Sequence, residues 1–292
     1  MNTLTLNSYA KLNLYLEVLN IRKDQYHNIK TIFERISLSD KIILRSRQDK
    51  KIKIICSSPE IPKDNSNLAY QSAQLLQRSL NINRGADIEI IKHIPVGSGL
   101  GGGSSNAAGV LVGLNKLWRL NLSQKELISY AGKVGCDVPF FVYNIPFAQG
   151  RARGDKIRQL ELLDNVRFWH ILVVPKLMVS SARIYKEWDS LRMKLTKPKY
   201  NVKILTSALR TFNFALIGEA LFNSLEQVTT KLYPQVRRIK EKLMQMGVKS
   251  ILMSGSGPAV FGIVSSRREG QVLYRQLKEK YRFWQVYVTR TQ

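Results

Sequence analysis

A glycine-rich segment constrains this chain more than any other feature. It runs from Pro95 to Ala108 as Pro-Val-Gly-Ser-Gly-Leu-Gly-Gly-Gly-Ser-Ser-Asn-Ala-Ala, after a strand-like stretch and before a helix-like one. Glycine takes the left-handed backbone region without steric cost and lets a ligand approach the main chain closely. The first N–H groups of a helix lack internal partners, and the helix dipole favours negative charge beside them. The segment therefore predicts an anion site, and phosphate is the natural anion.

The surrounding pattern narrows the kind of phosphate site. Apolar residues recur at three-and-four spacing from Ala107 to Trp118, which predicts a helix, and alternation over 86–91 predicts a strand before the loop. Gly97, Gly99 and Gly102 match the dinucleotide pattern, but residues 117–123 lack the acidic residue that this fold needs. A P-loop needs lysine directly after its last glycine, where Ser104 stands. A purely structural alternative is a turn that only packs a helix on a sheet, and five glycines with two hydroxyls disfavour it.

Composition and charge limit the class of protein. The chain has 292 residues, 44% of them hydrophobic, which suits two domains with real cores. The net charge is +25; residues 1–150 hold 19 basic and 11 acidic residues, and the second half holds 27 and 10. A nucleic-acid partner is the alternative that such charge raises, but the basic residues are dispersed and no recognition motif occurs. We expect a basic surface that attracts polyanionic small molecules, with no nucleic-acid partner.

Targeting signals and metal motifs are not visible in the sequence. The first ten residues lack a basic region followed by an apolar one, and no run approaches a membrane span. We therefore expect a cytoplasmic protein without a membrane partner. Cys56 and Cys136 are expected to be free thiols. The three histidines show no zinc-ligand spacing.

The order of predicted elements indicates an α+β fold. Alternation over Leu12–Val18 predicts a strand that projects Lys11 and Asn13 to one side. A capping box at Ser123–Glu126 starts a helix that Gly135 can end. The basic turn Gly150–Gly154 is a candidate domain boundary. The remaining predicted elements are strands at 31–38, 41–56, 140–143, 169–174, 250–253, 259–264 and 283–289, helices at 68–80 and 269–280, and a mostly helical stretch at 181–246.

Five segments in order resemble the GHMP kinase family. They are Ala10-Lys-Leu-Asn-Leu14, Asp24-Gln-Tyr-His27, Pro95–Ala108, Gly135-Cys-Asp-Val-Pro139 and Ser254-Gly-Ser-Gly-Pro258. The branch that they resemble phosphorylates a cytidine diphosphate derivative of methylerythritol on its 2-hydroxyl, in non-mevalonate isoprenoid synthesis. The resemblance implies an N-terminal, ribosomal-protein-S5-domain-2-like ATP-binding domain at 1–158. It also implies a C-terminal, ferredoxin-like α/β sandwich at 159–292.

The resemblance assigns roles in catalysis. Asp137 would accept the proton of the substrate hydroxyl or orient that hydroxyl. Lys11 would keep Asp137 ionised and neutralise charge on the transferring phosphoryl group, and Asn13 would hydrogen-bond the substrate or Asp137. ATP would bind with Mg²⁺, for which Ser104 and Ser105 are candidate hydroxyl ligands. The residues expected along the ATP phosphates are Pro95, Gly97, Ser98, Gly99, Leu100, Gly101, Gly102, Gly103, Ser104 and Ser105.

The resemblance also assigns residues to the two ligands. Tyr26 would stack on the cytosine, His27 would hydrogen-bond its edge and Tyr185 would close the other face. Asn67 and Lys92 would lie on the ATP side, while Gly255 and Gly257 would lie beside the substrate. Each residue also has an alternative role without function, such as a turn cap for Asp137 or an exposed loop residue for Tyr26. The protein is expected to be a monomer or a weak homodimer.

Two departures from the family pattern bear on these expectations. Gln25 stands where the family usually has glycine before Tyr-His, and a left-handed backbone there would be strained. Asn106 stands where the family carries Asp or Asn, so that position offers no acidic Mg²⁺ ligand. The alternatives are a GHMP kinase for homoserine, a sugar or mevalonate, a nucleic-acid-binding protein, and a dinucleotide dehydrogenase. Tyr26 and His27 argue against the first, because those acceptors have no base to stack.

Overall fold

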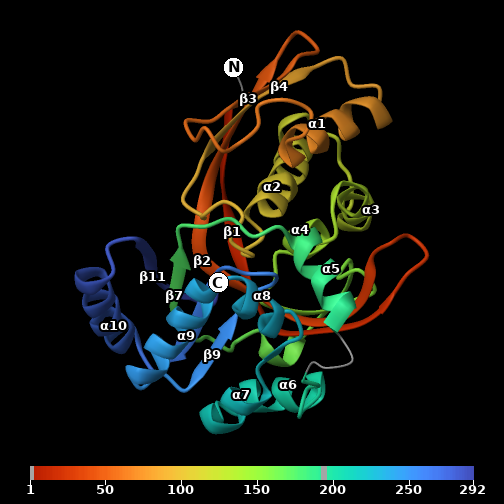
Figure 1. Ribbon diagram of the computed structural model, residues 1–292. Coiled ribbons are helices and arrows are strands. Elements are labelled where there is room, and N and C mark those ends of the chain that lie inside the picture. Colours follow the sequence, from red (N-terminus) through yellow and green to blue (C-terminus); the bar gives the residue numbers. More distant parts are fainter. Residues whose placement is uncertain (1–2, 192–195) are drawn as a thin grey trace.

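A long antiparallel hairpin forms the centre of the sheet in the first half of the chain. The computed structural model describes residues 3–191 and 196–292, and it is drawn in Figure 1. Strands β1 (Thr3–Ile21) and β2 (His27–Arg47) pair along most of their length. They form a sheet of order β3-β4-β2-β1-β8, with a hairpin of β5 and β6 attached to β2. The other strands are β3 (Ile52–Ile55), β4 (Gly85–Ile91), β5 (Phe147–Arg151), β6 (Lys156–Gln159) and β8 (Phe222–Asn223).

The prediction of separate strands at 31–38 and 41–56 is wrong. One strand, β2, continues through the polar Ser39-Asp40 pair, because these residues pair in register with Tyr9 and Ser8 of β1. The register shift between Tyr9 and Ala10 is a bulge at 37–38 that does not end the strand. Asp40 is fully buried there and is not a break in the strand. The chain then turns after Arg47, and 52–55 form β3, which pairs with β4 instead of extending β2.

Four helices accompany the first sheet, and α2 lies directly on it. They are α1 (Leu68–Ser79), α2 (Gly102–Leu117), α3 (Gln124–Val134) and α4 (Val138–Tyr143). A Cβ at Gly113 would lie 2.3 Å from Leu44 Cδ1, so glycine here allows α2 to approach the sheet. The predicted capping box of α3 and its end at Gly135 are both confirmed.

The predicted strand at 140–143 is wrong, because these residues belong to α4. Pro139 stands in the first helical turn, where its missing N–H costs nothing. An apolar run of four residues cannot distinguish a buried helical turn from a strand. The helix begins directly after Asp137, which is its N-cap residue.

The second half forms a four-stranded sheet of order β11-β7-β10-β9, antiparallel between neighbours. In chain order this is 4-1-3-2, the ferredoxin-like arrangement that the resemblance implied. Its strands are β7 (Trp169–Pro175), β9 (Ser250–Met253), β10 (Val260–Val264) and β11 (Trp284–Arg290). Its helices are α5 (Ser181–Leu191), α6 (Val202–Arg210), α7 (Phe214–Ala220), α8 (Glu226–Leu232), α9 (Pro234–Gln245) and α10 (Arg267–Lys280), with a 3₁₀ turn η1 at Glu161–Leu163. The expected helical stretch at 181–246 is thus found, apart from the short strand β8 and residues 192–195, which lie outside the described part.

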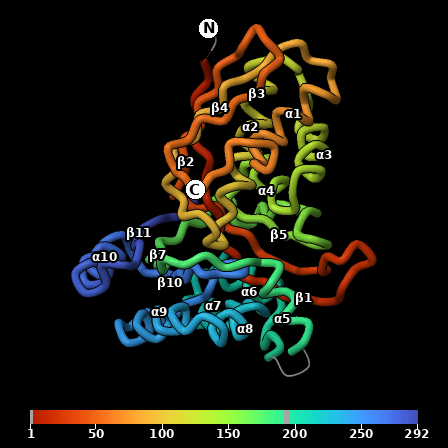
Figure 2. Tube along the Cα trace, turned by 45° about the horizontal axis from the view of Figure 1, so that its top comes forward, coloured from red at the N-terminus to blue at the C-terminus, as the bar shows by residue number. Residues whose placement is uncertain are grey.

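The two faces of the second sheet have different neighbours. One face packs against α9 and α10, which run side by side in Figure 2. The opposite face contributes Leu172 and Phe261 to a core shared with Leu12 and Leu14 of β1. The two sheets are also linked by a fully buried pair, since His170 Nε2 lies 3.1 Å from Glu34 Oε2.

The turn Gly150–Gly154 lies within the β5–β6 hairpin. We propose the division into 1–158 and 159–292, which cuts the chain at the end of β6. The short strand β8 crosses this division, because Phe222 and Asn223 pair with Tyr15 and Leu16 of β1. Within the described ranges, none of the helices combines the length and the apolar character needed to cross a membrane.

Candidate active site

The glycine loop has the backbone that an anion site requires. Gly97, Gly99 and Gly101 have φ of +63°, +80° and +70°, a region that side chains rarely adopt. Gly101 is the N-cap of α2, so no side chain caps this helix, and its first turn carries no acidic residue. The N–H groups of that turn are therefore available to phosphate oxygens, with the helix dipole adding to the attraction.

Neighbouring segments hold this loop in place. The N–H of Lys11 donates to the carbonyl of Leu100 at 3.0 Å, and that of Ala259 donates to Ser98 at 3.1 Å. The Ser254 hydroxyl donates to the carbonyl of Gly99 at 3.2 Å. A Cβ at Gly99 would lie 2.3 Å from the carbonyl oxygen of Ser254, so only glycine fits. Strand β1, the glycine loop and the 254–258 loop thus meet at one place.

Lys11 and Asp137 form an ion pair at this meeting point. Lys11 Nζ lies 3.5 Å from Asp137 Oδ2, and the lysine side chain is 5% exposed while the aspartate is 31% exposed. Asp137 makes no side-chain hydrogen bond to the start of α4. Its carboxylate therefore does not cap this turn, which was the structural alternative to a catalytic role. The carboxylate is left free to meet a ligand from the open side.

Asn13 positions Lys11. Its Oδ1 accepts a hydrogen bond from Lys11 Nζ at 2.5 Å, and its Nδ2 donates to Thr31 Oγ1 at 2.8 Å. Thr31 donates in turn to the carbonyl of Tyr15 at 2.6 Å. The sequence suggested that Asn13 hydrogen-bonds the substrate or Asp137, whereas the structure shows it bonded to Lys11.

The 254–258 loop closes the other side of the pair. A Cβ on Gly255 would lie 3.5 Å from Lys11 Nζ and 3.4 Å from Asn13 Oδ1, which places this glycine against the ion pair. Gly257 lies deeper, where a Cβ would meet Met253 Sδ at 2.7 Å. Both glycines have positive φ.

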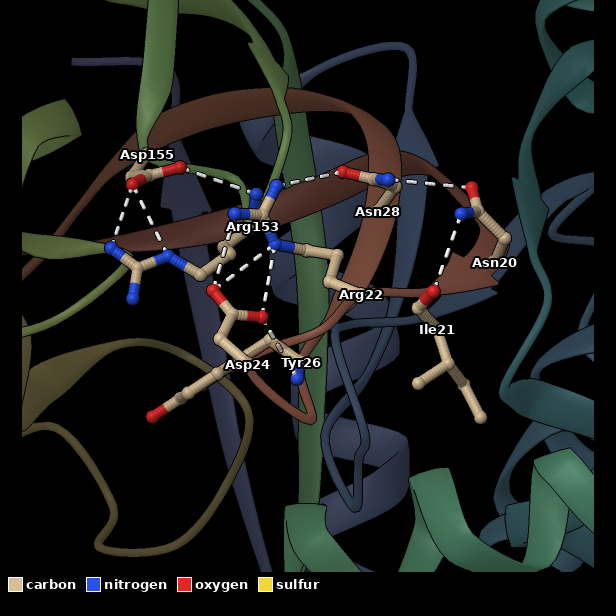
Figure 3. A network of polar contacts seen from close by, with 8 residues as sticks. All are labelled: Asn20, Ile21, Arg22, Asp24, Tyr26, Asn28, Arg153 and Asp155. Atoms are coloured by element: carbon tan, nitrogen blue, oxygen red, sulfur yellow. Dashed lines mark hydrogen bonds and ion pairs between the residues drawn. The ribbon is translucent and has the colours of Figure 1, made fainter.

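The Tyr26-His27 segment lies between the β5–β6 turn and α5. Tyr26 is 53% exposed, and the Arg153 guanidinium lies 5.2 Å from its ring centroid (Figure 3). His27 is buried, and its Nε2 lies 2.9 Å from Asp189 Oδ1. Its ring stacks on Tyr185 at 4.8 Å between centroids. Tyr26 thus presents an open aromatic face, whereas the His27 Nε2 that could read a base is engaged by α5.

Burial and neighbouring charges shift the pKa values of two side chains near Asp137, those of Tyr185 and Cys136. Burial, then the nearby charge of Asp137, raises the pKa of the Tyr185 phenol. Burial also raises the pKa of Cys136, the neighbour of Asp137, to about 11, against an opposing effect of Arg153. Tyr185, Arg153 and the turn at 135–139 therefore lie close enough to influence one another's charges.

Asn67 and Lys92 have structural partners. Asn67 caps α1 by accepting from the Ala69 N–H at 2.9 Å, and it donates to the carbonyl of Pro62 at 2.7 Å. Lys92 forms an ion pair with the buried Asp40. A Cβ on Gly102 would lie 3.1 Å from Lys92 Nζ, so this lysine borders the start of α2. Lys92 therefore lies beside the glycine loop, while Asn67 shapes the segment before α1.

Several residues of the site were missed by sequence reasoning. Asp40 accepts hydrogen bonds from the backbone of His93 and Ile94 and from Asn106, at 2.7–2.9 Å, which fixes the approach to the glycine loop. Ser8 donates to Ser105 Oγ at 2.7 Å. A lone aspartate or serine within a strand carries no signal of this kind. The role of Ser254 could have been suspected from its place in the motif 254–258.

The described residues offer little for an all-protein metal site. No group of three or more His, Cys, Asp or Glu side chains in ranges 3–191 and 196–292 could hold an ion. Ser105 is engaged by Ser8, whereas Ser104 is half-buried in the first turn of α2. This donor set fits a Mg²⁺ ion held mainly by nucleotide phosphates and water, with the Ser104 hydroxyl beside it.

The fold and this constellation define a class of small-molecule kinase, and the comparisons agree. A model of the "GHMP kinases N terminal domain" matches residues 67–144, and one of the "GHMP kinases C terminal" matches 205–282. The chain belongs to the GHMP kinase family.

Relatives within the family share one name. A 4-diphosphocytidyl-2-C-methyl-D-erythritol kinase from a Geobacillus species is 41% identical over 92% of this chain and 91% of its own length. The crystal structure of a 4-(cytidine 5'-diphospho)-2C-methyl-D-erythritol kinase matches with a TM-score of 0.82 and 28% identity, over 99% of this chain and all of the other. A homoserine kinase from Cytophaga hutchinsonii matches with a TM-score of 0.75 and 20% identity, over 99% of this chain and 94% of its own, which shows the shared fold alone.

Proposed function

We propose that this chain uses ATP to phosphorylate the 2-hydroxyl of 4-diphosphocytidyl-2-C-methyl-D-erythritol, a step of non-mevalonate isoprenoid synthesis. The carrying observation is the Lys11–Asp137 pair, 3.5 Å apart, between the glycine loop and the Tyr26-His27 segment. A phosphate site on one side and an aromatic platform on the other suit an acceptor that carries both a hydroxyl and a base.

The glycine loop would bind the nucleotide. Its backbone from Val96 to Gly103, which follows Pro95, would donate N–H groups to the phosphate oxygens of ATP, together with Ser104 at the start of α2. Lys92 would add a positive charge near the first turn of α2, and Asn67 would shape the side on which the nucleotide lies. Mg²⁺ beside Ser104 would supply shielding of the β- and γ-phosphate charge when bound.

Transfer would then depend on positioning and charge. Asp137 takes the proton of the acceptor's 2-hydroxyl, the hydroxyl oxygen bonds to the γ-phosphorus, and the bond to the bridging oxygen breaks to release ADP. Lys11, paired with Asp137, stabilises the negative charge on the moving phosphoryl group. Asn13 holds the lysine at 2.5 Å, which fixes the ammonium before the substrate arrives.

The base of the acceptor would lie at the Tyr26 platform. Tyr26 offers an open ring for stacking, and base–aromatic stacking contributes about 1–3 kcal/mol. His27 and Tyr185, stacked on each other, would form the adjoining wall. Homoserine, sugars and mevalonate carry no base that could stack on this ring. We further propose that the protein acts in the cytoplasm, as a monomer or weak homodimer.

The test is acceptor-dependent ADP release by the purified protein. The panel is the cytidyl acceptor, homoserine, galactose and mevalonate, each with ATP and Mg²⁺. We expect turnover with the cytidyl acceptor and background rates with the others. A higher specificity constant for another acceptor would replace the proposed substrate while leaving the kinase class in place.

A further inference from the structure

The turn between β1 and β2 adopts a shape that its sequence does not favour. The Gln25 N–H donates to the Arg22 carbonyl at 3.2 Å, and the Arg22 N–H donates to the Tyr26 carbonyl at 2.7 Å. Gln25 has φ of +66°. Hairpins in which a turn is followed by a left-handed residue usually have glycine at that position. Something other than local preference must therefore stabilise the backbone immediately before Tyr26.

An ionic cluster within the turn provides that support. The Arg22 guanidinium donates to Asp24 with Nε at 3.1 Å and Nη2 at 3.1 Å, and with Nη1 to Asn28 Oδ1 at 3.1 Å. Asp24 Oδ1 also accepts the N–H of Tyr26 at 3.2 Å. In Figure 3 the contacts from Arg22 and from the Tyr26 N–H meet at Asp24, while Arg22 also reaches Asn28 on its other side. The cluster, which we call the turn clasp (Arg22, Asp24 and Asn28), braces the strained residue from both sides.

A second arginine lies against the aromatic ring that the turn presents. The Arg153 guanidinium, 5.2 Å from the Tyr26 centroid, comes from the β5–β6 turn. Asp155 Oδ2 holds it through Nη2 at 2.9 Å and Nε at 3.3 Å. A guanidinium near an aromatic ring is attracted by the ring quadrupole, and here it ties Tyr26 to a second segment.

We propose that Arg153 is a positioning residue for the base of the acceptor and acts through the Tyr26 ring. The turn clasp stabilises the positive φ of Gln25, a backbone conformation that glycine at position 25 would adopt without such support. This inference rests on the proposed function, because the base is that of the cytidyl acceptor. Without Arg153 the ring would sample more orientations, and stacking would weaken while the Lys11–Asp137 pair stayed intact.

The first arm of the test measures binding without phosphoryl transfer. The probe is cytidine 5'-monophosphate, titrated by calorimetry into the full chain. Arg153→Met, which keeps much of the side-chain length and removes the charge, should weaken binding about two- to fivefold. Arg158→Met, on the exposed side of the same hairpin, is the matched control and should leave the affinity unchanged.

The second arm tests the clasp by rescue. Arg22→Met should accelerate hydrogen exchange of the Tyr26 amide and weaken binding of the probe, because Asp24 loses its partner. Adding Gln25→Gly should restore both, since glycine needs no brace at positive φ. In turnover assays Arg153→Met should raise the KM of the cytidyl acceptor by the same factor and leave the KM of ATP and kcat unchanged.

The two claims fail in different ways. If the wild type binds the probe without turning over the acceptor, and Arg153→Met binds the probe about two- to fivefold more weakly, the proposed reaction is rejected and the positioning role is supported. Equal affinities for wild type, Arg153→Met and Arg158→Met overturn the positioning role, as does a wild type that does not bind the probe. Failure of Gln25→Gly to rescue Arg22→Met overturns the clasp.

Discussion

Replacing Asp137 by asparagine is the sharpest single perturbation of this site. The change keeps the shape of the side chain and removes both the charge and the capacity to take a proton. At 3.5 Å, and with an effective dielectric of about 20, the attraction to Lys11 amounts to about 5 kcal/mol, an upper bound that the partial exposure of Asp137 reduces. General base catalysis contributes about 10²–10⁴ in rate. We therefore expect kcat to fall by about two to four orders of magnitude.

The same structure predicts that the fold survives. Lys11 keeps its hydrogen bond to Asn13, and Asp137 makes no capping bond whose loss would destabilise α4. The melting temperature should fall by about 2–4 °C for each kcal/mol of the Lys11–Asp137 attraction that is lost, and the chain should stay folded at 25 °C. The assay is steady-state ADP release at saturating ATP, alongside a thermal melt.

Asp164→Asn, in the connection between β6 and β7, serves as the matched control. It should leave kcat unchanged. A kcat for Asp137→Asn within tenfold of the wild type would refute the assignment of a base. Loss of folding in that variant would refute the argument that its carboxylate has no structural role.

Three further predictions follow from particular contacts. Tyr26→Ala should raise the KM of the cytidyl acceptor about tenfold or more without changing that of ATP; equal increases would refute stacking. Gly99→Ala should abolish ATP-dependent turnover, because its Cβ would meet the Ser254 carbonyl at 2.3 Å and φ is +80°; normal kinetics would refute the packing of the two loops. The alkylation rate of Cys136 should rise with pH up to about 11, whereas the denatured chain levels off near 9. Its raised pKa makes a contribution to stability that is complete below pH 9 and lost as pH rises through 11; an alkylation midpoint near 9 in the folded chain would contradict this.

The sequence predicted those elements whose formation depends on residues close together in the chain. The strand through Lys11, the helix after the glycine loop and the capping box at Ser123 each depend on residues within one turn or one strand. The strained backbone at Gln25 was foreseen for the same reason, because it follows from the chemistry of one turn position.

The misses have a common physical cause, which is tertiary contact. The continuous strand β2 depends on a bulge in its pairing with β1, and Asp40 becomes a buried acceptor only through residues about fifty positions away. Arg153 meets Tyr26 because two hairpins lie together, and Asp189 reaches His27 from α5. No local spacing encodes such contacts, so the sequence suggested candidate site residues but not the contacts that hold them.

Phosphorus NMR of the reaction products is the most direct test of the central claim. Wild-type protein with ATP, Mg²⁺ and the cytidyl acceptor should yield one new monoester signal on the acceptor, equal in amount to the ADP formed. The Asp137→Asn variant, folded and able to bind ATP, should yield less than about one-hundredth of either product in the same time. ADP appearing without a phosphorylated acceptor, or an undiminished monoester signal from the variant, would contradict transfer at the Lys11–Asp137 pair.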